Sequence, residues 1–443
     1  MNLQHITEVL HQKIATISDT QEAMLLAKAA EKLNLGNVKV VDSLSDLDAE
    51  TGVENYQLYF VEDDEALYYY LDGLWNSILY TNDTVWAWGV NTVYQLGDGT
   101  TISRTSPVSV ITEFTDWVEI KAADGFTIGL RANGTLWSWG VNTFGQLGDG
   151  TATLRISPVS VIGGFTDWIQ ISAHTQHTLA LRSDRTLWAW GNNGSGRLGD
   201  NTATNRSSPI SVVGGFTDWI QVSAGSAHSL GLRDNGTAWA WGQGFAGKLG
   251  DGTTTNRSSP VSVVGGFTSW IRVEAGNAGS IGLLANGNAY AWGSNTSGQL
   301  TRDPAFTTSV TSPVSIMHFE NEWIDVSINN ATCYGKKTDG TVWAWGNNMN
   351  GELGANSAVV TMQSVLQVAG GFTDWVRIEG GTNFAIGVRA NGTIWTWGLN
   401  TDGRLGDGTT TTRSSPVSAI GGFTDWVSAS AGNGFVAAIR SGE

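Results

Sequence analysis

The residues best suited to chemistry in this sequence are its histidines. There are six, and the closest pair in the middle of the chain is His174-Thr-Gln-His177. Two imidazoles at this spacing could ligate a metal ion. The pair occurs in one repeat only, however, and a pair of satisfied turn residues is the simpler interpretation. No nucleophile, base and acid fall into a catalytic order, so we expect no metal, no cofactor and no enzyme activity.

Repeated carboxylates are the second chemical feature. Glu62-Asp-Asp-Glu65 has the composition of a solvated hairpin tip. Loops of the form Leu-Gly-Asp-Gly-Thr lack the alternating carboxylates of a calcium site, and Asp-Gly is an ordinary turn pair. We therefore predict that the loop carboxylates are structural. They are Asp98, Asp149, Asp251 and Asp407.

These loops belong to a repeat that fills most of the chain. Each copy has a strand ending in an aromatic pair and glycine, as in Leu136-Trp-Ser-Trp-Gly140, and then the Gly-rich loop. The closing glycines are 51, 51, 51, 51, 53 and 52 residues apart. A fixed period of this size is typical of units that bury their faces against their neighbours. The closing glycines are Gly89, Gly140, Gly191, Gly242, Gly293, Gly346 and Gly398.

One repeat can be divided into four strands. The second repeat unit predicts strands at 168–173, 178–182, 186–190 and 209–213, with Pro209 at the start of an outer edge strand. Tryptophans at alternate positions of the third strand lie on one face, where we expect them to pack against the next unit.

The two ends of the repeat region complement each other. Its N-terminal side begins with a third strand, 84–88, and its C-terminal side ends with a first and a second strand, 426–430 and 435–440. Joined, they make one complete unit and leave no exposed edge. The sequence therefore predicts an all-β seven-bladed propeller over residues 81–443, closed by two strands plus two.

The repeat resembles the RCC1 (regulator of chromosome condensation) type. The resemblance rests on Trp-x-Trp-Gly-x-Asn-x-x-Gly-x-Leu-Gly-Asp-Gly-Thr and covers about four-fifths of the chain. It implies a rigid platform for binding proteins. The founding member's nucleotide exchange needs an insertion from one blade, which these even spacings lack. The family's turn histidine is kept only at His177 and His228.

The first 80 residues differ in composition. They hold 14 acidic and 4 basic residues but only 3 of the 57 glycines. Apolar residues at helical spacing predict a helical hairpin over 1–36, and short alternating runs predict a small β module over 37–80. The helix 16–33 and the run Tyr59-Phe-Val-Glu-Asp to Trp75 resemble N-terminal modules of bacteriophage tail-fibre and virion proteins.

That second resemblance implies an anchor that binds other virion proteins and forms a homo-oligomer such as a trimer. A short hairpin cannot cover several large aromatic side chains by itself. The aromatic residues we predict for this anchor interface are Tyr59, Tyr68, Tyr69, Tyr70 and Trp75.

Whole-chain properties exclude several classes. The formal net charge is −16 with no Lys/Arg run, which disfavours nucleic-acid binding. No apolar run is long enough for membrane insertion, and no secretory signal is evident. A single cysteine, Cys333, permits no intrachain disulfide.

Binding is expected on the long loops between third and fourth strands. The returns between units are nearly identical, whereas these loops diverge, which is typical either of a recognition face or of unconstrained drift. The candidate binding residues are Tyr94, Phe144, Phe245, Arg302, Phe306 and Met349.

The function that we expect is that of a non-enzymatic structural or attachment protein in the virion of a tailed phage. It would be a tail-fibre-like adhesin that is assembled in the host cytoplasm and binds a host-surface protein or glycan. The alternative is a cytoplasmic RCC1-like protein-interaction module, such as a guanine-nucleotide exchange factor. A lectin or an enzyme is a more distant alternative.

Overall fold

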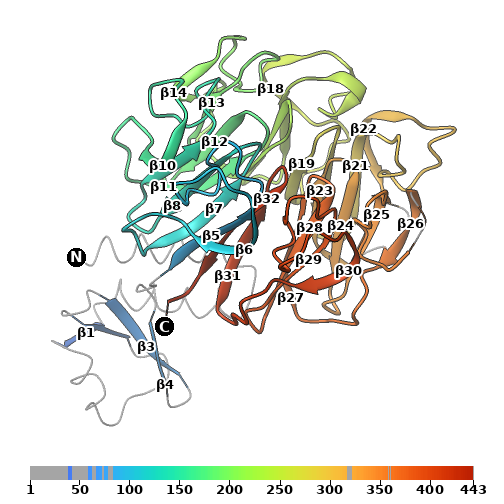
Figure 1. The fold of residues 1–443 in the computed structure, drawn as a ribbon. Helices are drawn as coiled ribbons and strands as arrows, with labels where there is room; N and C mark the ends of the chain where they lie inside the picture. Colours follow the sequence, from blue (N-terminus) through green and yellow to red (C-terminus); the bar gives the residue numbers. More distant parts are fainter. Residues whose placement is uncertain are drawn as a thin grey trace. The chain divides into compact units, whose positions relative to one another are not determined.

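The computed structural model describes residues 83–316, 322–357, 359 and 361–442, with the backbone only at 361–363, together with the backbone of four N-terminal strands (Figure 1). The chain divides into two compact units, Met1–Asn82 with Gly442–Glu443, and Asp83–Ser441. No helix in the described part of the chain is long and apolar enough to cross a membrane.

The N-terminal unit contains a four-stranded sheet. Its strands are β1 (Val38–Val41), β2 (Leu58–Val61), β3 (Ala66–Leu71) and β4 (Leu74–Ser77), in that order. β1 and β2 are parallel, and the other neighbours are antiparallel. These strands lie where the alternating pattern predicts them. The helical hairpin expected over 1–36 lies outside the described residues.

The second unit is a seven-bladed propeller built from four-stranded antiparallel sheets. We number blades 1 to 6 from β7 to β30 in chain order, four strands each, and blade 7 is β31-β32-β5-β6. The fold predicted from the sequence is confirmed.

Each position in a blade has its own signature. First strands begin at tryptophan: β7 (Trp117–Ala122), β11 (Trp168–Ala173), β15 (Trp219–Ala224), β19 (Trp270–Ala275), β23 (Trp323–Asn329), β27 (Trp375–Gly381) and β31 (Trp426–Ala431). Second strands follow a tight turn: β8 (Phe126–Arg131), β12 (His177–Arg182), β16 (His228–Arg233), β20 (Gly279–Leu284), β24 (Thr332–Lys337), β28 (Phe384–Arg389) and β32 (Phe435–Arg440).

Third strands carry the aromatic pair: β5 (Thr84–Gly89), β9 (Leu136–Gly140), β13 (Leu187–Gly191), β17 (Ala238–Gly242), β21 (Ala289–Ser294), β25 (Val342–Asn347) and β29 (Ile394–Gly398). Fourth strands form the outer edge: β6 (Arg104–Ser109), β10 (Arg155–Ser160), β14 (Arg206–Ser211), β18 (Arg257–Ser262), β22 (Ser309–Ser315), β26 (Thr361–Gln367) and β30 (Arg413–Ser418).

Blade 7 closes the ring as predicted. β32 pairs with β5 from Phe435↔Gly89 to Arg440↔Thr84, so the two ends of the propeller share one sheet. Alternate residues of β32 belong to different cores, because successive strand residues face opposite sides. Val436 packs in a cluster with blade 6, and Phe435 packs in a cluster with blade 1.

The tryptophans of the third strands pack against the preceding blade, not the next one as we predicted. Trp190 of blade 2 lies in a cluster with Ile128 and Leu136 of blade 1. In six blades the buried indole N–H also donates to a carbonyl of the preceding long loop, as Trp139 does to Gln95 at 3.1 Å. Alternation in the sequence shows that the tryptophans share one face of the sheet. It does not show whether that face contacts the preceding or the following blade, and the prediction was wrong on this point.

The fourth strand also begins earlier than predicted. In blade 2 it runs from Arg206, and Pro209 lies in its middle, not at its start. The ladder shifts register between Ala189 and Gly191 on the partner strand, so the proline lies at an irregularity of an edge strand. There its missing N–H costs no regular ladder bond.

Five of the return segments are tied to their own blade by an Asp–Arg ion pair. In blade 2 the Asp167 carboxylate accepts two hydrogen bonds from Arg182 at the end of β12, at 2.9 and 2.8 Å. The Arg182 guanidinium also lies 4.4 Å from the centre of the Phe165 ring. Blade 5 has Glu322 with Lys337 instead, and blade 4 has Ser269 with Leu284, so both partners change together.

Candidate functional site

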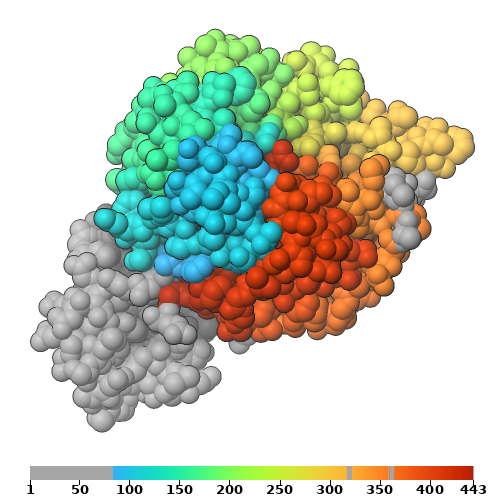
Figure 2. Space-filling view, in the orientation of Figure 1, coloured from blue at the N-terminus to red at the C-terminus, as the bar shows by residue number. Residues whose placement is uncertain are grey.

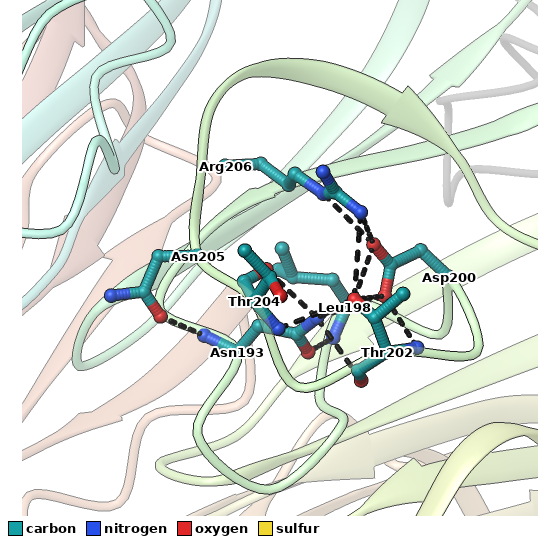
Figure 3. Close-up of polar contacts among 7 residues, drawn as sticks. All are labelled: Asn193, Leu198, Asp200, Thr202, Thr204, Asn205 and Arg206. Carbon is teal, nitrogen blue, oxygen red and sulfur yellow. Dashed lines mark hydrogen bonds and ion pairs between the residues drawn. The ribbon is translucent and has the colours of Figure 1, made fainter.

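The long loops are held by an internal network that Figure 3 shows for blade 2. Asp200 accepts hydrogen bonds from the Asn193 amide at 2.8 Å and from the Thr202 N–H at 3.0 Å. Arg206, the first residue of β14, donates to the same carboxylate at 2.9 and 2.7 Å. The loop is thereby tied to the strand that follows it.

The loop aspartates are therefore structural groups. Burial alone would raise the pKa of Asp200, but hydrogen bonds from Thr202, Arg206 and Asn193 outweigh it and lower that pKa. In the described part of the chain, no group of three or more His, Cys, Asp or Glu is placed to hold a metal ion. The same pairing occurs at Asp98–Arg104, Asp149–Arg155, Asp251–Arg257 and Asp407–Arg413.

Blades 4 and 5 lack this pair. The other blades have an aspartate two residues after the buried leucine of the long loop. At this position blade 4 has Arg302 and blade 5 has Ala355. In the other blades the fourth-strand residue that pairs with the closing glycine is an arginine. At this position blade 4 has Val310 and blade 5 has Met362. Both partners are thus lost together, and these two loops are free of the constraint that keeps the others alike.

Large apolar side chains are exposed on these loops. Phe306 of blade 4 is 89% exposed, and Met349 of blade 5 is 71% exposed. Phe245, in the short 3-10 helix η1 (Phe245–Gly247) of blade 3, is 72% exposed. We call Phe245, Arg302, Phe306 and Met349 the loop surface. The segment ahead of β22 that carries two of them projects from the ring (Figure 2).

Two of the predicted binding residues do not belong to the loop surface. Tyr94 and Phe144 are half-buried and lie on the loops of blades 7 and 1. The Phe144 N–H donates to the Gln146 side chain at 2.9 Å, which folds this loop tip back on itself. The prediction also missed Ile102 and Val359, which are 60% and 50% exposed, although both lie in stretches where the loops diverge.

The predicted anchor residues are placed by their backbone alone. Tyr59 and Tyr68 are Cα partners on β2 and β3, and Tyr70 and Trp75 are partners on β3 and β4. Tyr69 is the partner of Asn76 on β4. Their role as an interface stays a prediction.

The turn histidines are buried and neutral. His177 Nε2 lies 2.9 Å from Ser229 Oγ, which itself donates to the Arg197 carbonyl at 2.8 Å, so the imidazole is the donor and carries its proton on Nε2. Burial, and secondarily the Arg197 charge, holds the pKa of His177 well below its ordinary value. His228 repeats the arrangement with Ser280 at 2.9 Å. These histidines are structural donors between blades.

The inner strands bring charges together around the axis of the ring. Arg272 pairs with Glu274 at 2.6 Å and with Asp325 of the next blade at 2.9 Å. Burial raises the pKa of Glu274, and the Arg272 charge opposes that effect. Through these two ion pairs Arg272 links blade 4 to blade 5.

Comparison with known proteins identifies the repeats. A family model described as the RCC1-like domain matches residues 162–443. A model of the regulator of chromosome condensation (RCC1) repeat matches residues 82–130 and 133–181.

Two relatives are similar to this chain in sequence. The E3 ubiquitin-protein ligase HERC2 of Mus musculus is 28% identical over 319 residues, which are 67% of this chain and 6% of HERC2. The chain thus spans a small part of that protein. The ultraviolet-B receptor UVR8 of Arabidopsis thaliana is 26% identical over 76% of this chain and 78% of its own length.

A solved structure has the same fold. Prp20p of Saccharomyces cerevisiae, whose structure was described together with its binding to Gsp1p and histones, superposes with a TM-score of 0.73. The match covers 82% of this chain and 92% of Prp20p at 18% sequence identity.

Proposed function

Because this chain belongs to the family of RCC1-like domains, we propose that its propeller is a non-enzymatic platform that binds another protein through the loop surface. The observation that carries the proposal is the coincidence of two features. Large apolar side chains are exposed on the loops of three consecutive blades, and two of these loops have lost the internal Asp–Arg pair. Exposed aromatic and methionine side chains next to an arginine have the composition of a protein interface.

The loop surface also defines the kind of partner. Phe245, Phe306 and Met349 offer apolar contacts on a rigid ring. Among the described residues Arg302 makes no ion pair, so its guanidinium is available to a carboxylate of the partner. A protein-binding role for a propeller of this fold agrees with the binding of Prp20p to Gsp1p and histones.

Attachment to a phage particle is a less supported hypothesis than a cellular protein-binding platform. It depends on the resemblance of residues 1–80 alone, and no observation on the propeller favours it. The relatives HERC2 and UVR8 come from mouse and Arabidopsis, and they favour a cellular interaction module, with a cytoplasmic location as the matching proposal. Identification of the binding partner would decide among the finer hypotheses. These are nucleotide exchange, a virion location and a trimeric anchor.

The test is affinity capture with the full chain and with the variant F245S/F306S/M349S, from lysate of the source cells. We expect a specific protein to be captured by the wild type and lost by the variant, and the same purified protein to bind the wild type directly. The matched control is I111S/I156S, which removes exposed aliphatic residues outside the loop surface, 59% and 52% exposed.

Two outcomes would contradict the proposal. If the loop variant captures and binds the same protein as the wild type, the loop surface is not the interface. If the protein is instead recovered in purified phage particles and is bound there through residues 1–80, the virion reading replaces ours.

A further inference from the structure

A cavity of about 440 Å³ lies among the loops of blades 7, 1 and 6, away from the loop surface of blades 3 to 5. Its wall comes from the long loops after β5, β9 and β29, and from the turns between first and second strands of blades 1, 2 and 7. Neither the proposed protein contact nor the loop pairs account for this cavity.

Three glutamine amides line the cavity, and each has its acceptor end already engaged. Gln95 Oε1 accepts from the Val93 N–H at 3.0 Å, and Gln146 Oε1 accepts from the Phe144 N–H at 2.9 Å. Gln176 Oε1 accepts from the Asn192 amide at 2.8 Å. The engaged oxygens fix the orientation of the amides, so the NH₂ groups are the ends left to bind a ligand.

Arg404 adds a cation to the same wall. Its Nη1 donates to the Thr382 carbonyl at 3.2 Å and its Nη2 donates to Asp402 at 2.7 Å. Nε has no hydrogen-bond partner among the described residues, although the residue is only 7% exposed. A buried guanidinium N–H without an acceptor is costly, and such groups are normally satisfied by water or by a ligand.

The remaining wall limits the ligand. Phe144, Val93 and Val141 supply an apolar side, and Asp124, held by the Asn433 amide at 2.8 Å, supplies a negative charge. The neutral amide donors, together with Arg404, whose charge is already shared with the Asp402 carboxylate, suit a group with no more than one negative charge, spread over two oxygens. Asp124 disfavours a doubly charged group such as phosphate.

We propose that this cavity binds a carboxylate, which accepts hydrogen bonds from the free amide groups of Gln95 and Gln146 and lies beside Arg404. The carboxylate could belong to a free small molecule or to an acidic side chain of a partner. Both sources present the same chemistry, and the experiment separates them.

Sister copies within the chain supply the variants. At the position of Gln146, blade 5 has Glu352, whose carboxylate accepts from the Asn350 N–H as Gln146 does from Phe144. Gln146→Glu therefore keeps the loop bond and replaces the free NH₂ group with negative charge. Blades 1, 4 and 7 have glutamine at the position that Arg404 occupies in blade 6. Arg404→Gln therefore removes the cation and introduces a side chain that this position already accommodates in other blades.

The experiment is calorimetric titration of the full chain with acetate, glutarate, inorganic phosphate and a short peptide with one internal glutamate. We expect saturable binding of glutarate or of the peptide, weakened at least tenfold by Gln146→Glu and by Arg404→Gln. Gln299→Glu, the same change in blade 4 outside the cavity, should leave binding unchanged.

The probes then identify the source. Tighter binding of the peptide than of glutarate assigns the cavity to a partner's side chain, and the reverse assigns it to a free carboxylate. Absence of binding by every carboxylate probe, phosphate bound as tightly as glutarate, or equal binding by wild type and Gln146→Glu would each overturn the proposal.

Discussion

At the residue scale, equivalent positions carry different side chains for one structural purpose. The first residue of the second strand is always the partner of the closing glycine, whether it is Phe126, His177 or Thr332. Phenylalanine fills this position by packing, whereas histidine also donates to a serine of the next blade. Because the histidines are fully buried, their protonation is coupled to folding.

The first prediction concerns pH. Burial lowers the pKa of His177 and of His228 in the folded protein. Below the ordinary histidine pKa, the unfolded chain therefore binds more protons than the folded chain. Stability must therefore fall as pH decreases below about 6.5, by up to about 1.4 kcal/mol per pH unit for each histidine. Denaturant unfolding between pH 7 and 5 should show a flatter profile for H177F/H228F than for the wild type. Identical slopes would contradict the burial argument.

The second prediction concerns the loop network. Asp200→Ala removes an acceptor of several hydrogen bonds, including those from Asn193 and Arg206, and should cost about 2–3 kcal/mol of unfolding free energy. Asp234→Ala is the control, because Asp234 and its partner Arg185 are 45% and 53% exposed, and it should cost less than about 0.5 kcal/mol. Chemical denaturation measures both, and equal losses would show that the network adds nothing.

At the element scale, strands and turns were predictable where a local rule determines them. Tryptophans at alternate positions, followed by the closing glycine, predict where each third strand lies. Trp168 is the first residue of a first strand. Two features depend on neighbours instead. The blade against which Trp190 packs is set by the direction of the ring, and the exposure of Phe144 is set by a loop that folds back onto Gln146.

The third prediction tests the return segments by a double-mutant cycle. Blade 4 has Ser269 and Leu284 in place of the Asp–Arg pair, so D167S/R182L copies a natural combination into blade 2. Each single change leaves a charge without its partner and should cost about 1 kcal/mol. The double change should cost less than their sum, with a coupling energy of about 1 kcal/mol. Additive effects measured by thermal or denaturant unfolding would mean that the pair contributes nothing specific.

At the scale of the whole molecule, the sequence determines the number of blades and the closure, but not the site. Seven copies and complementary ends leave one way to pair every edge, which is why the ring was predictable. The cavity beside Arg404 was not, because its walls come from six connecting segments that meet only when the ring is closed. Closure is therefore a condition for that site as well as for stability.

The last prediction tests closure. A fragment of residues 83–425 lacks β31 and β32, and it uncovers Trp88 of blade 7 and Trp117 of blade 1, both 0% exposed in the intact ring. Because β32 packs in the cores of both neighbouring blades, its loss opens two interfaces at once. We expect this fragment to bind a hydrophobic dye and to lose its cooperative unfolding transition, whereas residues 83–441 unfold in one sharp transition. Adding residues 426–441 as a separate peptide should restore part of the transition, since the strand pairing does not need a covalent link. If the shorter fragment unfolds at the same denaturant midpoint as residues 83–441, the seventh blade is not what holds the ring together.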